Sequence, residues 1–351
     1  MVRSGGMPGD VLGRAIRSLR SVVGAATAVT LVLAATGGSA SAETAKVVLQ
    51  FGISYLPLSV MQAENLWEKR AKELGLDLKV EWQNLGNGGA LNDAILTGSA
   101  DLAAGGLAPM MKLWDRTRGN VKVRGIAALN SSSLLLVTNR PDIKSLKDFK
   151  PDDKIALSVP KVSYQAVVLQ MAAEEQFGKG QFEKLDAQTV SMKHSDAVAA
   201  LLSPRSSIAA YFGSSPYQEA VMKRPGIQKV LTSFDVLGGP TTFSAVWSAT
   251  SFVEKRPVAY KAFLLALDDA VKRIANDRPG VVDDYIKVTN TEESERESLL
   301  AIVNDPQNVY TLVPQNTEKF SEFLARTGFL DNKPVSWKDY FFPGIYPLGG
   351  N

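Results

Sequence analysis

A glycine-rich stretch in the first third of the chain has the residue types and spacing of an anion-binding site. Residues 86–89, GNGG, follow a strand-like run that ends at Gln83. Glycines there let the backbone turn sharply and expose its N–H groups. Residues 90–96 have helical apolar spacing, and the apolar run 101–104 leads into a second glycine pair, Gly105-Gly106. Small ligands bind α/β proteins at such strand ends and helix N-termini.

We expect the ligand contacts to come from loops that join a strand to the following helix. Backbone amides and serine hydroxyls there suit a sulfonate, nitrate, carboxylate or phosphate-like group. Lys161 is a candidate countercharge, and Tyr55 and Tyr164 could flank an apolar or planar part of the ligand. Helix capping, core packing and solvent exposure are the structural alternatives for these serines, tyrosines and the lysine. The candidate ligand-binding residues are Ser54, Tyr55, Gly88, Gly89, Ala90, Gly106, Leu107, Ala108, Asn130, Ser131, Lys161, Ser163, Tyr164, Gly213 and Ser214.

Other kinds of site find little support in the sequence. The chain has no cysteine and one histidine, His194, which we expect in a surface loop, so neither a zinc site nor a Ser-His-Asp triad is predicted. Neither a G-x-S-x-G elbow nor a G-x-x-x-x-G-K-[ST] loop occurs. Residues 86–89 lack the third small residue of a dinucleotide fingerprint, because Leu91 stands there. Paired acids are interpreted as solvated faces. We therefore predict no catalytic residue, no metal and no cofactor.

The N-terminus has the pattern of a secretory signal peptide. Four arginines precede an uncharged run, 21–36, and Ala40 and Ala42 stand at the small-residue positions of a cleavage site. We predict a leader of residues 1–42, cleaved after Ala42, and a periplasmic location. Removing its four arginines and one acid, Asp10, from totals of 39 basic and 36 acidic residues leaves equal numbers. The mature chain is then formally neutral, which gives no indication of nucleic-acid binding.

Strands and helices alternate along the mature chain. Strand-like runs at 46–53, 77–83, 121–129 and 133–138 enclose helical segments, which is typical of an α/β lobe with a mostly parallel sheet. A second cycle fills residues 155–233. A strand at 241–248 and a largely helical return follow the break at residues 238–240.

This order predicts two lobes. The first is discontinuous, 43–137 plus 240–351, and the second, 138–239, is inserted into it. Strands 133–139 and 240–248 are the expected hinge, which would let the lobes close on a ligand. The aromatic tail residues Trp337, Tyr340, Phe341 and Phe342 are expected to pack back on the first lobe.

The order of glycine loop, helix and residues 97–109, TGSADLAAGGLAP, resembles the periplasmic substrate-binding proteins of ABC importers. It is most similar to the nitrate/sulfonate/taurine (NitT/TauT-type) family. There, the small-residue G-x-A-D pattern marks a helix end before the third strand, and the loop after that strand touches the ligand. Residues 336–346, SWKDYFFPGIY, are also similar to the family's C-terminal pattern. The resemblance covers essentially the whole mature chain and implies an α/β, two-lobed type II periplasmic-binding-protein fold.

The resemblance implies a non-enzymatic, extracytoplasmic solute-binding protein. It would capture a small anionic or zwitterionic solute, such as a sulfonate, taurine or nitrate, and deliver it to an ABC importer permease with a separate ATPase subunit. A monomer is expected. One alternative is a thiamine-precursor-type enzyme on the same fold, although that group uses a site with histidine and cysteine and this chain has only His194. The other is a ligand-sensing periplasmic module.

Overall fold

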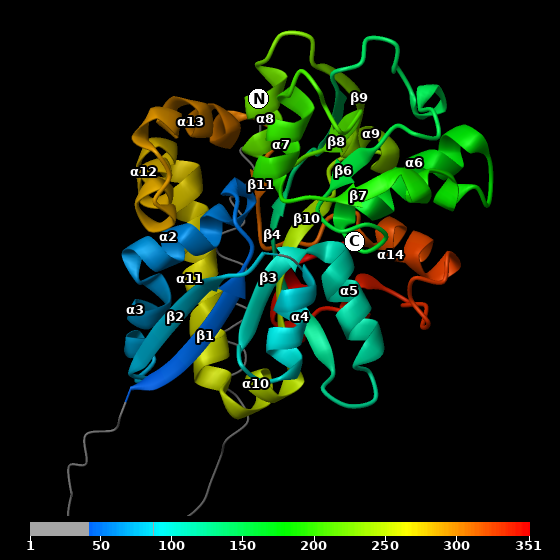
Figure 1. Ribbon diagram of the computed structural model, residues 1–351. Coiled ribbons are helices and arrows are strands. Elements are labelled where there is room, and N and C mark those ends of the chain that lie inside the picture. The colour runs from blue at the N-terminus through cyan, green and yellow to red at the C-terminus, as the bar shows by residue number, and fades with distance from the viewer. Residues whose placement is uncertain (1–41, 87) are drawn as a thin grey trace, which may run out of the picture.

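The computed structural model describes residues 42–86 and 88–351, so the expected leader lies outside the described residues except for Ala42. Within these residues, eleven strands form two sheets, which lie one above the other in Figure 1. Sheet one contains β1 (Glu43–Leu49), β2 (Leu78–Asn84), β3 (Leu102–Gly106), β4 (Val123–Ser131), β10 (Thr242–Ala249) and β11 (Val309–Tyr310), in the order β11-β4-β10-β3-β1-β2. Sheet two contains β5 (Leu135–Thr138), β6 (Ile155–Leu157), β7 (Thr189–Ser191), β8 (Ala210–Phe212) and β9 (Gln228–Thr232), in the order β7-β6-β8-β5-β9.

Both sheets are mixed, and in each of them most strands run in the same direction, as the sequence predicts for the first. In sheet one, β1 pairs in parallel with β2 and β3, whereas β10 pairs antiparallel with β3 and β4. In sheet two, β6 pairs in parallel with β7 and β8, whereas β5 pairs antiparallel with β8 and β9. The antiparallel strands β5 and β10 are the ones that the chain enters when it passes from one sheet to the other. Local apolar periodicity does not reveal the direction of a strand after such a crossing.

The chain crosses between the sheets at two neighbouring places. It leaves sheet one after β4 and enters sheet two at β5, and it returns through residues 238–241 to β10. Ser131 Oγ donates to the Thr241 carbonyl at 2.9 Å, which joins the two crossing segments. The strand Leu135–Thr138, which the sequence suggests as part of the hinge, lies wholly in sheet two.

Helices cover both sheets (Figure 1). Around sheet one lie α2 (Leu56–Glu64), α3 (Leu66–Glu73), α4 (Gly88–Leu96), α5 (Leu107–Arg116), α10 (Thr250–Lys255), α11 (Pro257–Asn276), α12 (Arg278–Thr289) and α13 (Arg296–Asn304). Around sheet two lie α6 (Tyr164–Phe177), α7 (His194–Leu202), α8 (Tyr217–Met222) and α9 (Ser233–Leu237). The largely helical return expected after the strand at 241–248 consists of α10 to α13 and of α14 (Thr317–Arg326). No helix of the described residues is long and apolar enough to cross a membrane.

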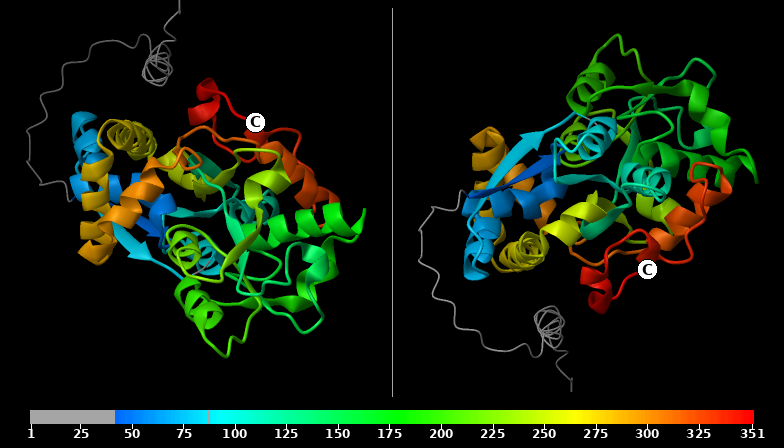
Figure 2. Two further views of the ribbon diagram at one scale, coloured as in Figure 1. Left: turned by 90° about the horizontal axis from the view of Figure 1, so that it is seen from above. Right: turned by 90° about the horizontal axis from the view of Figure 1, so that it is seen from below.

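The C-terminal helix α14 lies beside α6 of sheet two (Figure 2). Phe320 stacks on Tyr164 with ring centroids 5.0 Å apart, and Arg326 forms an ion pair with Glu174. Because these contacts join the last part of the chain to the middle part, the two sheets are held together on this side by packing as well as by the two crossing segments.

The aromatic tail packs on sheet one, as predicted. Gly125 of β4 donates to the Tyr340 carbonyl and accepts from Phe342 N, each at 2.8 Å. Gly125 leaves room for this contact, because a Cβ there would lie 2.5 Å from the Phe341 ring. The tail is therefore part of the core.

Truncating Phe341 should destabilise the whole fold. The side chain is fully buried, and removing a core phenylalanine costs about 3–5 kcal/mol. We expect Phe341→Ala to lower the free energy of unfolding in urea by about that amount. Val335→Ala is the matched control from the same tail, since Val335 is 94% exposed, and it should change nothing measurable. Equal stabilities of the two variants would contradict the assignment of the tail to the core.

Candidate ligand-binding site

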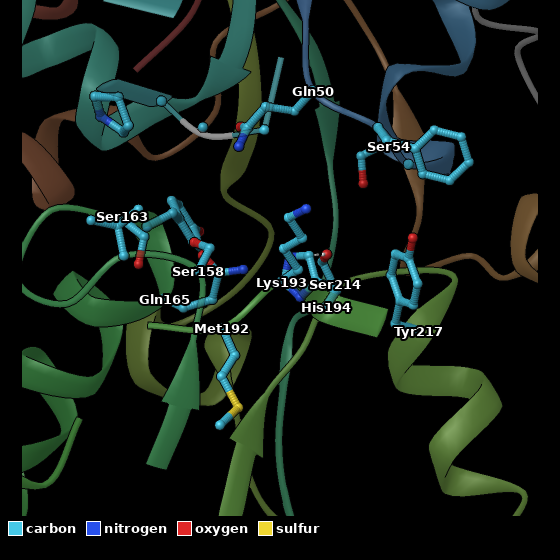
Figure 3. Close-up of a pocket in the computed structure, with 18 of the residues that line it drawn as sticks. Gln50, Ser54, Ser158, Ser163, Gln165, Met192, Lys193, His194, Ser214 and Tyr217 are labelled. Carbon is cyan, nitrogen blue, oxygen red and sulfur yellow. Dashed lines mark hydrogen bonds between the residues drawn. The ribbon is translucent and has the colours of Figure 1, made fainter. Parts of the chain in front are cut away.

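A cavity of about 990 Å³ lies between the two sheets and is lined from both sides (Figure 3). This is the size of sites that hold drug-sized ligands. The side of sheet one contributes Gln50, Phe51, Gly52, Ser54, Tyr55, Asn84, Leu85, Gly86, Gly88, Gly89, Gly106, Pro109 and Phe243. The side of sheet two contributes Ser158, Val159, Val162, Ser163, Tyr164, Gln165, Ser191, Met192, Lys193, His194, Ser195, Asp196, Ser214, Ser215 and Tyr217.

Several helices of eight or more residues begin at the wall of this cavity, among them α4, α6 and α7. Gly88 opens α4, Ser163 is the N-cap of α6, and His194 is the first residue of α7. Ser163 Oγ accepts from Ala166 N at 3.3 Å, so this serine caps its helix as the sequence suggests. Unpaired N–H groups and the helix dipole make each start favourable for negative charge. Helix starts from both sides therefore give the cavity a positive potential without many cations.

Lys193 and Asp196 are the only formally charged side chains among the described residues that line the cavity. Lys193 precedes α7, and its amine points into the cavity (Figure 3). Asp196 lies in the first turn of the same helix, where an acid stabilises the N-terminus. Lys193 thus places its cation beside a helix start.

His194 lies in the cavity wall, and the expectation of a surface-loop histidine is wrong. Its ring stacks on Tyr217 with centroids 5.5 Å apart, and its Nδ1 is 2.6 Å from the Tyr211 hydroxyl. Its Nε2 is 3.3 Å from Ser214 Oγ. Burial lowers the pKa of His194 to about 4, so the ring is neutral at pH 7. A neutral imidazole whose two nitrogens are both hydrogen-bonded contributes no charge to the cavity.

Because His194 is the only histidine, its titration can be followed directly by NMR. We expect a pKa of about 4 in the folded protein and about 6.5 after unfolding in urea. Between these values the unfolded chain binds a proton that the folded chain does not, so acidification from pH 6.5 to 4 favours unfolding. The loss amounts to on the order of 3 kcal/mol.

The matched comparison is His194→Gln, which cannot titrate. The free energy of unfolding of the natural chain should fall more than that of the variant between pH 6.5 and 4, while carboxylates contribute equally to both. A folded-state pKa near 6.5, or identical pH dependence of the two proteins, would contradict the buried neutral histidine.

The structure brings about half of the sequence-predicted contacts to the cavity. They come from the loop after β1, the starts of α4, α5 and α6, and the loop after β8. These residues are Ser54, Tyr55, Gly88, Gly89, Gly106, Ser163, Tyr164 and Ser214.

The other candidates do not line the cavity: Ala90, Leu107, Ala108, Asn130, Ser131, Lys161 and Gly213. Leu107 and Ala108 are the first two residues of α5 rather than part of the loop before it, and both are fully buried. Asn130 is also fully buried, where its Oδ1 accepts from Ser244 Oγ at 2.6 Å. Lys161 points to solvent and pairs with Asp186 at 3.8 Å. Ala90 follows the first two residues of α4 within that helix, and a Cβ on Gly213 would meet Tyr211 and Gln218 at 2.9 Å.

Several lining residues were missed from the sequence although they follow predicted strands. Lys193 and His194 come two and three residues after the end of β7, as the N-cap and first residue of α7, and Ser158 follows β6. The rule that ligands bind at the carboxyl ends of strands indicates these positions. Gln50 falls within the first strand expected at 46–53, so the sequence does not single it out. In the structure β1 ends at Leu49, and Gln50 lies in the loop after it. Gln50 Oε1 accepts a hydrogen bond from the Tyr55 hydroxyl at 3.2 Å.

Two α/β halves with a cavity between them define the architecture of periplasmic binding proteins. The chain is similar to the aliphatic sulphonate binding protein SsuA from Escherichia coli (TM-score 0.63, 18% identity, 86% of this chain and 99% of that chain). It is also similar to the nitrate-binding protein NrtA from Synechocystis PCC 6803 (0.64, 17%, 88% and 89%) and to the alkanesulfonate-binding protein SsuA from Xanthomonas axonopodis pv. citri bound to MOPS (0.65, 16%, 86% and 99%). These matches confirm the predicted type II fold.

The model of the NMT1-like family matches residues 40–288, and the chain belongs to that family. No curated protein matches the chain in sequence.

Proposed function

We propose that this protein is an extracytoplasmic receptor for a small anionic or zwitterionic solute, which binds in the cavity between the two sheets. One observation carries the proposal: helix starts from both sides and Lys193 converge on a single cavity of about 990 Å³. Such an arrangement attracts negative charge and encloses most of a small ligand.

The remaining parts of the proposal rest on the family and on the architecture. The chain is exported by cleavage after Ala42, acts in the periplasm as a monomer and delivers its solute to an ABC importer permease with a separate ATPase subunit. The two lobes, 43–137 plus 240–351 and 138–239, close on the solute about the crossing segments. Differential affinity of the permease for closed and open forms would then couple capture to transport.

A thermal-shift screen of the chain from Glu43 onward tests solute capture. Sulfonates, nitrate, carboxylates, amino acids and thiamine precursors are each added at high concentration. A solute at about 100 times its dissociation constant should stabilise the fold by roughly 2.7 kcal/mol. We expect at least one anionic or zwitterionic class to raise the melting temperature. If native mass spectrometry shows unliganded protein and no class produces a shift, solute capture of this kind is contradicted.

One observation favours the second candidate, an enzyme on the same fold. His194 Nε2 lies 3.3 Å from Ser214 Oγ in the cavity wall, and a neutral histidine near a hydroxyl is the arrangement of a general base. Stoichiometric binding without any chemical change of the solute, followed by mass spectrometry over hours, supports the receptor. Turnover that is lost in His194→Gln would support the enzyme.

A further inference from the structure

The volume of the cavity indicates how large the solute is. A nitrate ion occupies no more space than one or two water molecules, at about 30 Å³ each in the liquid. It would fill less than about a tenth of the roughly 990 Å³ between the sheets. A solute that touches both walls in this arrangement of the lobes must therefore be considerably larger than nitrate.

Two exposed apolar side chains face this cavity from opposite sides. Phe51, just after β1, is 41% exposed, and Val162, just before α6, is 39% exposed. Large apolar side chains with this much exposure are few among the described residues, and the others lie outside the cavity. Exposed apolar surface is unfavourable in water, and burial of a phenylalanine side chain is worth about tenfold or more in a binding constant.

The wall near Phe51 is aromatic. The Phe51 ring lies 6.3 Å from the Tyr285 ring. Across the cavity, Tyr217 lines the side of sheet two, and its ring stacks on the neutral His194 ring. Met192, a polarisable thioether that adapts to ring edges, lies on the side of sheet two (Figure 3). Flat or branched apolar groups pack well against such surfaces.

The charged groups of the cavity wall indicate the head group of the solute. Lys193 is the one lysine or arginine among the described lining residues, and its amine lies toward the centre of Figure 3 between the two walls. Lys193 and the helix starts, partly offset by the single lining acid Asp196, match one singly charged head group, such as a carboxylate or a sulfonate. A multiply charged phosphate ester would lack further cations.

We propose that the solute is an organic monoanion, with its carboxylate or sulfonate against Lys193 and an aromatic or branched apolar body against Phe51 and Val162. This inference rests on the proposed receptor function and narrows it: nitrate and taurine lack the apolar body.

Matched pairs of probes with one head group test the apolar body. Isothermal titration calorimetry compares benzoate and 3-methylbutyrate with acetate, and benzenesulfonate with methanesulfonate, taurine and nitrate. The inference predicts that an aromatic or branched anion binds at least about tenfold more tightly than the small anion with the same head group. Benzyl alcohol, which keeps the ring and lacks the charge, should bind far more weakly than benzoate.

Variants of Phe51 locate the effect. Phe51→Ala should lower the affinity for the larger anions by about tenfold or more and the affinity for small anions by less than about twofold. Phe51 is partly exposed in a loop, so the variant should fold, and an unchanged melting temperature without ligand checks this. Leu202→Ala is the matched control, since Leu202 is 37% exposed and lies outside the cavity, and it should leave all affinities unchanged.

The outcomes separate this inference from the receptor function on which it rests. Small anions that bind as tightly as their aromatic or branched counterparts would overturn the inference and leave the receptor standing. Benzyl alcohol that binds as tightly as benzoate would overturn the anionic head group. Absence of binding by every probe overturns the inference, and only absence of binding across the wider thermal-shift screen would also contradict the receptor.

Discussion

Replacing Lys193 by glutamate should lower the affinity for the anionic solute by about 100-fold or more. The variant removes the one cation of the described cavity wall and places a like charge beside the solute. Two charges about 4 Å apart near a protein surface interact by up to roughly 4 kcal/mol, which solvent around this exposed lysine reduces. Lys193→Met, which only removes the charge, should therefore lose about tenfold.

Salt and a second lysine serve as controls for this prediction. The difference between the natural chain and Lys193→Met should shrink as salt rises, because the amine is solvent-accessible and its field is screened within about 10 Å at 0.1 M. Lys161→Met removes a lysine that lies outside the cavity and pairs with Asp186, so it should leave affinity unchanged. Calorimetry measures all variants. Unchanged affinity in Lys193→Glu would mean that the anion does not bind near this side chain.

Gly88→Val should abolish binding while the protein still folds. Gly88 is the first residue of α4, and a Cβ there would lie 2.7 Å from Pro109 Cγ in the first turn of α5. Asn92 Nδ2 donates to the Pro109 carbonyl at 3.0 Å, so the two helices are joined at this point and cannot adjust independently. The added side chain must push the start of α4 away from its position at the cavity wall, and its N–H groups move with it.

The expected cost in stability is smaller than the cost in binding. Overpacking costs about 1–3 kcal/mol, which corresponds to a fall of a few degrees in the melting temperature of a chain of this size. Affinity should fall by about 100-fold or more, because the start of α4 is one of those that face the solute. Gly119→Val is the matched control, since a Cβ on Gly119 meets nothing within 4 Å. Full affinity in a folded Gly88→Val protein would exclude α4 from the binding site.

The sequence predicts those parts of the site whose signal is local. The glycines at the start of α4 and Ser163 before α6 can be predicted, because loop chemistry and capping leave a pattern within a few residues. Leu107 and Ala108, expected as ligand contacts in a loop, are instead fully buried in the first turn of α5. Burial of this kind depends on tertiary packing, which overrides local propensity.

The burial of His194 also depends on tertiary packing that the local sequence does not reveal. Its neighbours in sequence are polar, which is typical of a surface loop. The groups that bury it, Tyr211 and Tyr217, lie about twenty residues further along the chain and are brought to it by β8 and α8. Likewise, mixed sheets arise because β5 and β10 follow the crossings between halves, and strand direction after a crossing is not encoded in apolar alternation.

The most direct test of solute capture between the two sheets is the NMR signal of His194 with and without a saturating solute. Because this is the only histidine of the chain, its ring resonances report on the cavity wall alone. A solute whose binding is established by calorimetry should shift them, and Lys193→Glu should prevent the shift at the same concentration. Calorimetric binding that leaves the His194 resonances unchanged would place the solute elsewhere and contradict the account.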